Sequence, residues 1–317
     1  MSTVKGIKVG SADITGRYEN TYNPSDTVHL IVDALNLEEC GSISSPNTTT
    51  YDGSLQTPLP IVTAIVGNES VVLVKDTDYT LSYTNNKNAG IATVTATGIN
   101  NYTGSISSNW NIINAEIIVE TTDQSYTYDG NAYGSGPNVS VVDGTPTIRY
   151  RLTDYGEYTI INTPKFINVS ESGLIYYKVT APNHNDYEGS YKVIIKPKTA
   201  VLAWGPTSWR YDGNPHSTTC VVSNLVSDDT CTVTLSGNSI TNIGSTTVTA
   251  TGLDNPNYTL SGADNTSVLL VINPGLFVKI SGNWTPVKAV YKRVSGSWVQ
   301  QDMTTAFSTS GIYIKSN

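Results

Sequence analysis

The sequence predicts an all-β protein in which three similar, sandwich-sized units lie between two small β-rich end segments. Only 14% of the 317 residues are charged, against about 25% in a typical soluble domain, so the Glu, Lys and Arg of long amphipathic helices are scarce. Thr, Ser, Asn, Val, Ile, Gly and Tyr, which favour strands and turns, recur throughout. Three landmarks also appear in the same order in each unit, which indicates tandem repeats.

The N-terminal segment, residues 1–47, carries none of these landmarks, although residues 7–10 and 27–32 read as short strands. Neither its start nor any later stretch has an apolar run long enough for a secretory signal or a membrane span, so we expect neither export nor membrane insertion. A segment this small gains stability by docking on a partner. We expect it to anchor the protein, because residues 27–32 and 34–37 offer contiguous apolar surface.

The first landmark is Tyr-Asp-Gly, which begins at Tyr51, Tyr128 and Tyr211, 77 and 83 residues apart. Asp-Gly supplies the positive φ of a tight turn, and the tyrosine ring can pack beside that turn. The motif is therefore interpreted as a structural marker and not as a ligand site. We expect a positive φ at its three glycines, Gly53, Gly130 and Gly213.

The other two landmarks complete each unit. A glycine opens a strand of alternating β-forming residues at 90–97, 173–181 and 244–251. A marker containing tyrosine follows at 101–104, 186–189 and 257–259, and an apolar strand then ends in a short polar connector. These connectors predict units at 48–115, 116–199 and 200–274, followed by a C-terminal segment at 275–317.

These landmarks resemble those of the tandem bacterial immunoglobulin-like repeats called MBG-type or Big-type domains. The first unit is the most similar, with Tyr-Asp-Gly at 51–53, Asp-Tyr-Thr-Leu-Ser-Tyr at 78–83 and Asn-Tyr-Thr-Gly at 101–104. The second unit differs by the segment 158–166, and the third by a longer last turn at 254–256. The resemblance implies tandem immunoglobulin-like β-sandwiches over residues 48–274. Such modules serve surface adhesins, secreted enzymes and phage virion proteins alike.

The C-terminal segment contains two related turns, Ser-Gly-Asn-Trp ending at Trp284 and Ser-Gly-Ser-Trp ending at Trp298. Each is flanked by short strands and predicts a hairpin. Paired hairpins of this kind resemble the tails of many phage structural proteins. The two tryptophans either bind a partner chain or cover a small hairpin core.

Catalysis would need imidazoles or activated nucleophiles, and the chain has three histidines in three different segments. We expect His184 and His216 to be solvated loop residues and His29 to lie on a strand surface. No nucleophile elbow, zinc helix or phosphate-binding loop motif occurs. The sequence therefore predicts a non-enzymatic protein with no catalytic residues and no cofactor.

Metal binding is also not predicted. Asp76 and Asp78, and likewise Asp228 and Asp229, are close in sequence but lack the spacing of a dedicated calcium loop, so we expect exposed turn residues.

The three cysteines allow at most one intramolecular bridge. Cys220 and Cys231 can face each other across a hairpin, which leaves Cys40 free. The alternative is three free thiols in a chain made in a reducing cytoplasm.

The aromatic residues are mostly tyrosine, 20 of them, with five tryptophans and three phenylalanines. Rings with a polar tip suit interfaces and glycan stacking. Trp110, Trp204 and Trp209 lie in or beside predicted strands, and we expect them in sandwich cores.

The charge balance excludes one class of partner. A net charge of −8, without a basic stripe, does not fit nucleic-acid binding. We expect a non-enzymatic phage virion protein, as a capsid decoration, head fibre or tail component, assembled in the host cytoplasm and held to other virion proteins through its terminal segments. The alternatives are a bacterial cell-surface adhesin or stalk, and a module that binds host surface glycans. Head or tail location, oligomeric state, receptor and anchoring terminus stay open.

Overall fold

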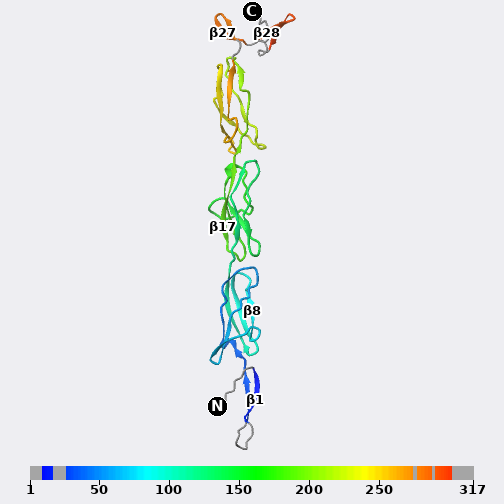
Figure 1. Ribbon diagram of the computed structural model, residues 1–317, viewed down its shortest axis with the longest axis vertical. Coiled ribbons are helices and arrows are strands. Elements are labelled where there is room, and N and C mark those ends of the chain that lie inside the picture. Colours follow the sequence, from blue (N-terminus) through cyan, green and yellow to red (C-terminus); the bar gives the residue numbers. More distant parts are fainter. Residues whose placement is uncertain (1–8, 17–25, 274–276, 288–289, 302–317) are drawn as a thin grey trace. The chain divides into compact units, whose positions relative to one another are not determined.

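The computed structural model describes residues 9–16, 26–273, 277–287 and 290–301, and this part of the chain is almost entirely strands and turns (Figure 1). The helical elements within it are one turn of α-helix, α1 (Leu37–Cys40), and one 3-10 turn, η1 (Val169–Glu171). No helix among the described residues is long and apolar enough to cross a membrane. The predicted all-β class is confirmed.

Each of the three repeats contains a four-stranded sheet of one topology. The orders are β5-β11-β9-β8, β13-β17-β16-β15 and β20-β25-β23-β22. The first sheet comprises β5 (Thr49–Thr50), β11 (Ser105–Ile113), β9 (Gly90–Gly98) and β8 (Tyr79–Thr84); the second, β13 (Gln124–Thr127), β17 (Tyr187–Lys196), β16 (Gly173–Thr180) and β15 (Thr147–Arg151); the third, β20 (Ser208–Arg210), β25 (Ser267–Asn273), β23 (Gly244–Leu253) and β22 (Val233–Ser236). In all three, the first strand along the chain pairs parallel with the last.

A second, smaller layer accompanies each sheet. It comprises β4 (Gly41–Ile43), β6 (Val62–Val66) and β7 (Glu69–Val72) in the first repeat, β12 (Ile118–Glu120) and β14 (Asn138–Ser140) in the second, and β19 (Leu202–Trp204) and β21 (Cys220–Val222) in the third. Two layers of mainly antiparallel strands identify the repeats as tandem immunoglobulin-like sandwiches.

The alternation in β9 shows how the sequence forms such a sheet. Ala92, Val94 and Ala96 are completely buried. The threonines between them face the other way, where Thr93 donates a hydrogen bond to Asn109 and Thr95 is hydrogen-bonded to Ser107. The period of two predicted for residues 90–97 is therefore confirmed.

Of the three tryptophans expected in the sandwich cores, only Trp110 is buried. Trp110 is buried and packs edge-on against Tyr83, with 6.3 Å between the ring centroids. Trp204 and Trp209 are only half-buried, so placing them in the core was wrong. The indole of Trp204 donates to the carbonyl of Asn265, and Trp209 stacks on His216 with 5.1 Å between centroids. An indole N–H that has a partner can lie at the edge of a core.

Backbone packing groups the described residues into two compact units. One takes in the chain up to 122 together with 136–163 and 175–190; the other takes in 123–135, 164–174 and the remainder. The division runs through the middle repeat. The exact limits of the five predicted segments remain predictions.

The N-terminal limit of the first sandwich nevertheless lies earlier than the predicted residue 48. Leu37 is completely buried against Val62, Leu73 and Tyr79, and β4 pairs with β6. Upstream of α1, β3 (Leu35–Asn36) pairs with β10 (Tyr102–Thr103). Leu37 therefore fills this core and is not part of an anchoring surface.

The two ends of the described chain form hairpins. Near the N-terminus, β1 (Gly10–Gly16) pairs antiparallel with β2 (Asp26–Val32). The predicted C-terminal hairpins are β26 (Phe277–Ile280) with β27 (Asn283–Pro286), and β28 (Val290–Val294) with β29 (Ser297–Gln301). Trp284 is 68% and Trp298 37% exposed, so these rings leave apolar surface open to a partner.

All three cysteines are free thiols. Cys220 pairs in register with Trp204, and its neighbour Val221 bridges to Thr232. Of the two alternatives, the structure therefore has free thiols and no bridge from Cys220 to Cys231.

Replacing Leu37 by Ala is expected to destabilise the first repeat by about 2–5 kcal/mol, because it leaves a cavity in a closed core. Leu35→Ala is the matched control, since Leu35 is 38% exposed, and should cost less than about 1 kcal/mol. Hydrogen exchange of β9 and β11 under increasing urea measures both effects. Equal protection in the two variants would contradict the placement of Leu37 in the core.

Candidate functional site at the repeat joints

The residues singled out for chemistry do not gather into a reactive cluster. His29 lies on β2, more than half exposed, with its Nδ1 2.6 Å from Asp13 Oδ1, as expected for a strand-surface residue. The expectation for His216 was wrong, because it stacks on Trp209 and its Nε2 lies 3.0 Å from Asp212 Oδ1. Within the described ranges, no three His, Cys, Asp or Glu side chains are placed to share a metal ion.

The candidate aspartates serve turns and joints. Asp76 has a φ of 63° and pairs with Lys75, and Asp78 accepts a hydrogen bond from the Val74 amide. Asp228 has a φ of 68°. Asp229 accepts hydrogen bonds from two tyrosines, so it is not the exposed turn residue that was expected.

The Tyr-Asp-Gly turns have one local geometry. Gly53, Gly130 and Gly213 have φ values of 80°, 84° and 82°, which confirms the predicted positive φ. In each turn the aspartate Oδ1 accepts the backbone N–H two residues later, which is an Asx turn. The pKa of the Asp212 carboxyl is lowered to about 2, mainly by this hydrogen bond from Asn214 and then by the hydrogen bond with His216.

In the first two turns the tyrosine reaches the next repeat. The hydroxyl of Tyr51 donates to Asp143 Oδ2 at 3.0 Å, and the hydroxyl of Tyr128 donates to Asp229 Oδ2 at 2.8 Å. Both rings are 95% buried. Burial, and then the hydrogen bond to the carboxylate, raise the pKa of Tyr51 and of Tyr128. The motif therefore does more than support its own turn, because it joins consecutive repeats.

An asparagine of the following repeat forms hydrogen bonds to the preceding repeat. Asn183 accepts from the backbone N–H of Ala89 at 3.1 Å and donates to Asn88 at 3.2 Å. Asn257 repeats this arrangement, accepting from the N–H of Val169 at 2.9 Å and donating to Asn168 at 2.8 Å. One side-chain amide thus uses both its oxygen and its nitrogen across each joint.

An aromatic residue follows each of these asparagines and packs edge-on against the tyrosine. The centroids of His184 and Tyr51 are 5.6 Å apart, and those of Tyr258 and Tyr128 are 5.7 Å apart. His184 is 96% buried, so the prediction of a solvated loop residue was wrong. Its Nε2 accepts from the amide of Val142, which places the ring proton on Nδ1, facing the carbonyl of Pro182.

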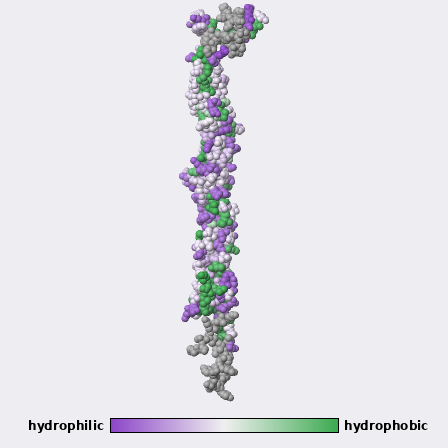
Figure 2. Space-filling view, viewed as in Figure 1, coloured by the Kyte–Doolittle hydropathy of each residue, from purple (hydrophilic) through white to green (hydrophobic). Residues whose placement is uncertain are grey.

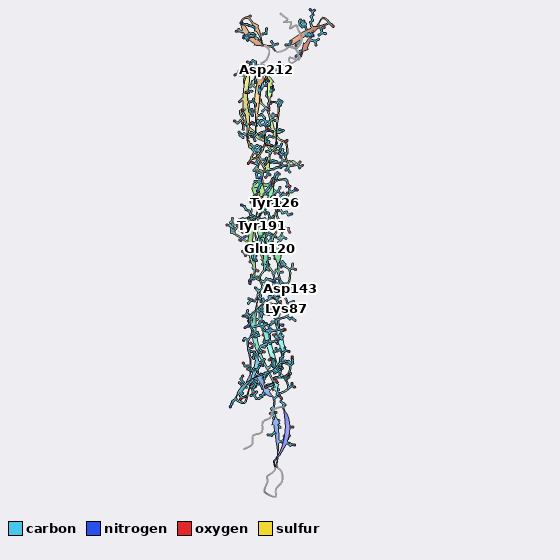
Figure 3. All side chains as sticks on the ribbon, viewed as in Figure 1. Lys87, Glu120, Tyr126, Asp143, Tyr191 and Asp212 are labelled. Carbon is cyan, nitrogen blue, oxygen red and sulfur yellow. The ribbon has the colours of Figure 1, made fainter. Side chains whose placement is uncertain are left out.

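The backbone closes both joints. Ala115 forms a parallel bridge with His184, in which the Ala115 N–H donates to the carbonyl of Asn183 at 3.0 Å and the Asn185 N–H donates to the carbonyl of Ala115 at 2.9 Å. At the second joint, β18 (Lys198–Thr199) pairs parallel with β24 (Tyr258–Thr259). Figure 3 shows Lys87 and Asp143 near each other at the first joint, where 4.0 Å separates Nζ from Oδ2.

Part of the arrangement recurs ahead of the first repeat. The amide of Val9 donates to the side chain of Asn101 at 3.1 Å, and the amide of Leu35 donates to its carbonyl at 3.0 Å. The sequence signal for all three places is a short Asn-aromatic pair, Asn101-Tyr102, Asn183-His184 and Asn257-Tyr258. The marker predicted for the second repeat was Asp186-Tyr187 and not Asn183-His184, so the recurring Asn-aromatic pair was missed.

The glycines of the first two turns touch the neighbouring repeat. A Cβ at Gly53 would lie 2.9 Å from Asp143 Cβ, and one at Gly130 would lie 2.6 Å from Val226 Cγ1. At Gly213 a Cβ would meet nothing within 4 Å. These contacts are structural and include no reactive group among the described residues.

Comparison with known proteins gives no family. No protein-family model matches the chain, and no curated protein matches it. Among solved structures, it is similar to extracellular cadherin domains 1–4 of protocadherin gamma B7 (10% identity, 84% of each chain, TM-score 0.26). It is also similar to immunoglobulin domains 1–5 of Sidekick-1 (11%, 84% of this chain and 66% of that one, 0.25) and to the four N-terminal Ig domains of Dscam1 (11%, 84% and 70%, 0.23). These scores are too low to bear on function.

Gly130→Ala and Gly213→Ala separate backbone strain from joint packing. Both place a Cβ at positive φ, which should cost about 1–2 kcal/mol. Gly130→Ala should cost more and should also speed hydrogen exchange at Val226 and Tyr258, because the new methyl group pushes against Val226. Urea unfolding and exchange on both variants measure this, and identical behaviour would refute the contact across the joint.

Alkaline pH should loosen the second joint. Burial is the main reason why the pKa of Tyr258 is raised from 10.0 to about 12. Because the unfolded chain loses this proton first, the stabilisation is complete below pH 10 and is lost as the pH rises through 12. Calorimetry between pH 9 and 12 should show a smaller decline of melting temperature in Tyr258→Phe than in the parent chain. An equally steep decline would assign the effect to other tyrosines.

Proposed function

We propose that this protein is a non-enzymatic structural component of a phage virion, in which immunoglobulin-like repeats of the MBG or Big type act as a spacer and the terminal segments contact other virion proteins. The observation that carries the proposal is the recurrence of one joint at two places. Neighbouring domains move freely unless a specific interface restrains them. The two joints use a tyrosine, an asparagine and an aromatic residue in the same roles. A spacer needs such recurring, specific joints between its repeats.

The surface chemistry agrees with a spacer. Three outward threonines of β9 are hydrogen-bonded to Asn and Ser side chains of β11 across the strands, which creates no reactive group. Charged residues are few, so the repeats offer little long-range attraction to nucleic acid or to other polyions.

The first repeat and the C-terminal hairpins offer apolar surface for partners. On the first repeat, Ile61, Val72 and Val74 are each about 60% exposed (62%, 65% and 59%) on or beside β6 and β7. Figure 2 shows apolar surface gathered on the lower part of this repeat. Exposed apolar patches of this kind mark interaction sites. The open tryptophans of the C-terminal hairpins provide a second contact.

Two other functions compete. A bacterial cell-surface stalk or adhesin would use the same joints and differ in where the protein is found. A glycan-binding module would depend on aromatic and charged side chains on a repeat surface. The C-terminal hairpins, which resemble those of phage structural proteins, favour the virion.

Gold-labelled antibodies raised against the purified chain should decorate phage particles released from the host that carries this sequence. A phage that encodes the chain without residues 1–32 should make the folded protein but incorporate less of it, because Leu37 and the first core are retained while the N-terminal hairpin is removed. Trp284→Ala with Trp298→Ala tests the other end in the same way. Label confined to the bacterial envelope would overturn the proposal in favour of the surface stalk.

A further inference from the structure

The solvent face of the middle repeat differs from the equivalent faces of its neighbours. Arg149 of β15 lies opposite Lys178 of β16, and Arg151 lies opposite Tyr176. The pairs at the same register are Ser82–Thr95 and Thr84–Thr93 in the first repeat, and Ser236–Thr249 in the third. Like charges directly opposite each other destabilise a sheet. The pairing of Arg149 with Lys178 therefore does not stabilise this sheet, although the other repeats have hydroxyls at these positions.

The segment that follows β15 holds one of these cations in place. Nη1 of Arg151 donates to the carbonyl of Gly156 at 2.6 Å. Its guanidinium lies 4.3 Å from the ring centroid of Tyr158 and 5.5 Å from that of Tyr176. Nε of Arg151 is buried and has no hydrogen-bond partner among the described residues. These contacts hold the guanidinium of Arg151 in one position, so it forms a fixed part of this face.

Arg149, Arg151 and Lys178 line a groove of about 480 Å³, whose other lining residues include Glu157, Tyr158 and Glu188. This volume lies within the range of small-molecule sites, about 300–1,000 Å³. Tyr158, the first residue of the segment 158–166 that distinguishes the second repeat in sequence, contributes to its wall together with the preceding Gly156 and Glu157.

The charged side chains in the groove differ in whether they already have ion-pair partners. Lys178 is held by Asp186 at 3.0 Å and by Glu188 at 3.3 Å, and Glu188 also accepts the hydroxyl of Tyr158. Arg149 is exposed and takes part in none of the ion pairs of the described chain. It is therefore the cation available to an incoming anion, and its planar fork fits a carboxylate.

The remaining groups narrow the ligand class. The carboxylates of Glu157 and Glu188 can accept hydrogen bonds from ligand hydroxyls, and their negative charge repels polyanions such as nucleic acid. Tyr155, on the same segment, is 74% exposed and offers an open aromatic face beside the groove residue Gly156. One carboxylate, several hydroxyls and an apolar ring face occur together in an acidic sugar.

We infer that this groove binds a carboxylate-bearing saccharide, such as a uronic or sialic acid unit of a surface glycan, with Arg149 on the carboxylate and the glutamates on the sugar hydroxyls. The inference goes beyond the proposed spacer function and does not depend on where the protein is assembled.

Saturation-transfer NMR with the full chain tests it, with glucuronate and N-acetylneuraminate as probes and glucose as the neutral control. At least one acidic sugar should bind with a Kd on the order of 1 mM, as expected for so small a ligand. Arg149→Ser with Lys178→Thr gives this face the residues of the first repeat, and should weaken binding about tenfold or more. Ser82→Ala with Thr95→Ala, at the matched positions of the first repeat, should leave binding unchanged.

The outcomes are distinct. The double variant should melt close to the parent temperature, because removing the opposed like charges offsets the loss of the ion pairs of Lys178 with Asp186 and Glu188; if it unfolds, the single change Arg149→Gln replaces it. Failure of both acidic sugars to bind at 20-fold above that Kd, equal binding of glucose, or binding that survives the loss of Arg149 would each overturn the inference. Displacement of the sugar by an equal concentration of inorganic phosphate would also overturn it, because it would show a simple anion site.

Discussion

The hydrogen bond from a buried tyrosine hydroxyl to a carboxylate of the next repeat is the interaction on which each joint depends. A buried hydroxyl or carboxylate without a partner costs much more than the pair gains when it is formed. The ring of Tyr51 or Tyr128 can therefore be buried at the joint only if the following sandwich presents Asp143 or Asp229 in the right place. This requirement links the Asx turn, the positive φ of its glycine and the close approach of the neighbouring loop, because each of them positions the tyrosine.

The other contacts make the joint specific. Asn183 and Asn257 bind both a backbone N–H and a side-chain oxygen of the preceding repeat, so their position is fixed in two directions. The aromatic neighbours add edge-on ring packing, which contributes about 0.5–1.5 kcal/mol for each pair. His184 and Tyr258 differ chemically and still serve the same role, because each ring offers an apolar edge to the tyrosine and a polar atom that accepts a backbone amide.

The sandwiches leave their broad faces free for other uses. In the first repeat three outward threonines of β9 are hydrogen-bonded to Asn and Ser side chains of β11. Against this background, the arginines and the lysine of the middle repeat stand out. The same fold can therefore hold position through its joints and carry a binding groove on one sheet, because the two features use different residues and different surfaces.

The sequence by itself determined what depends on local conformation. Period-two alternation predicted the strands, and Asp-Gly predicted the turns and the positive φ at Gly53, Gly130 and Gly213. The Ser-Gly-x-Trp motifs predicted the C-terminal hairpins. Each of these features depends on residues that are close in the chain. Only the tertiary structure decided that Leu37 belongs to the first core, that His184 is buried and that Tyr51 binds Asp143. These contacts join residues distant in sequence, and their partners are chosen by how two folded surfaces meet, which no local pattern records.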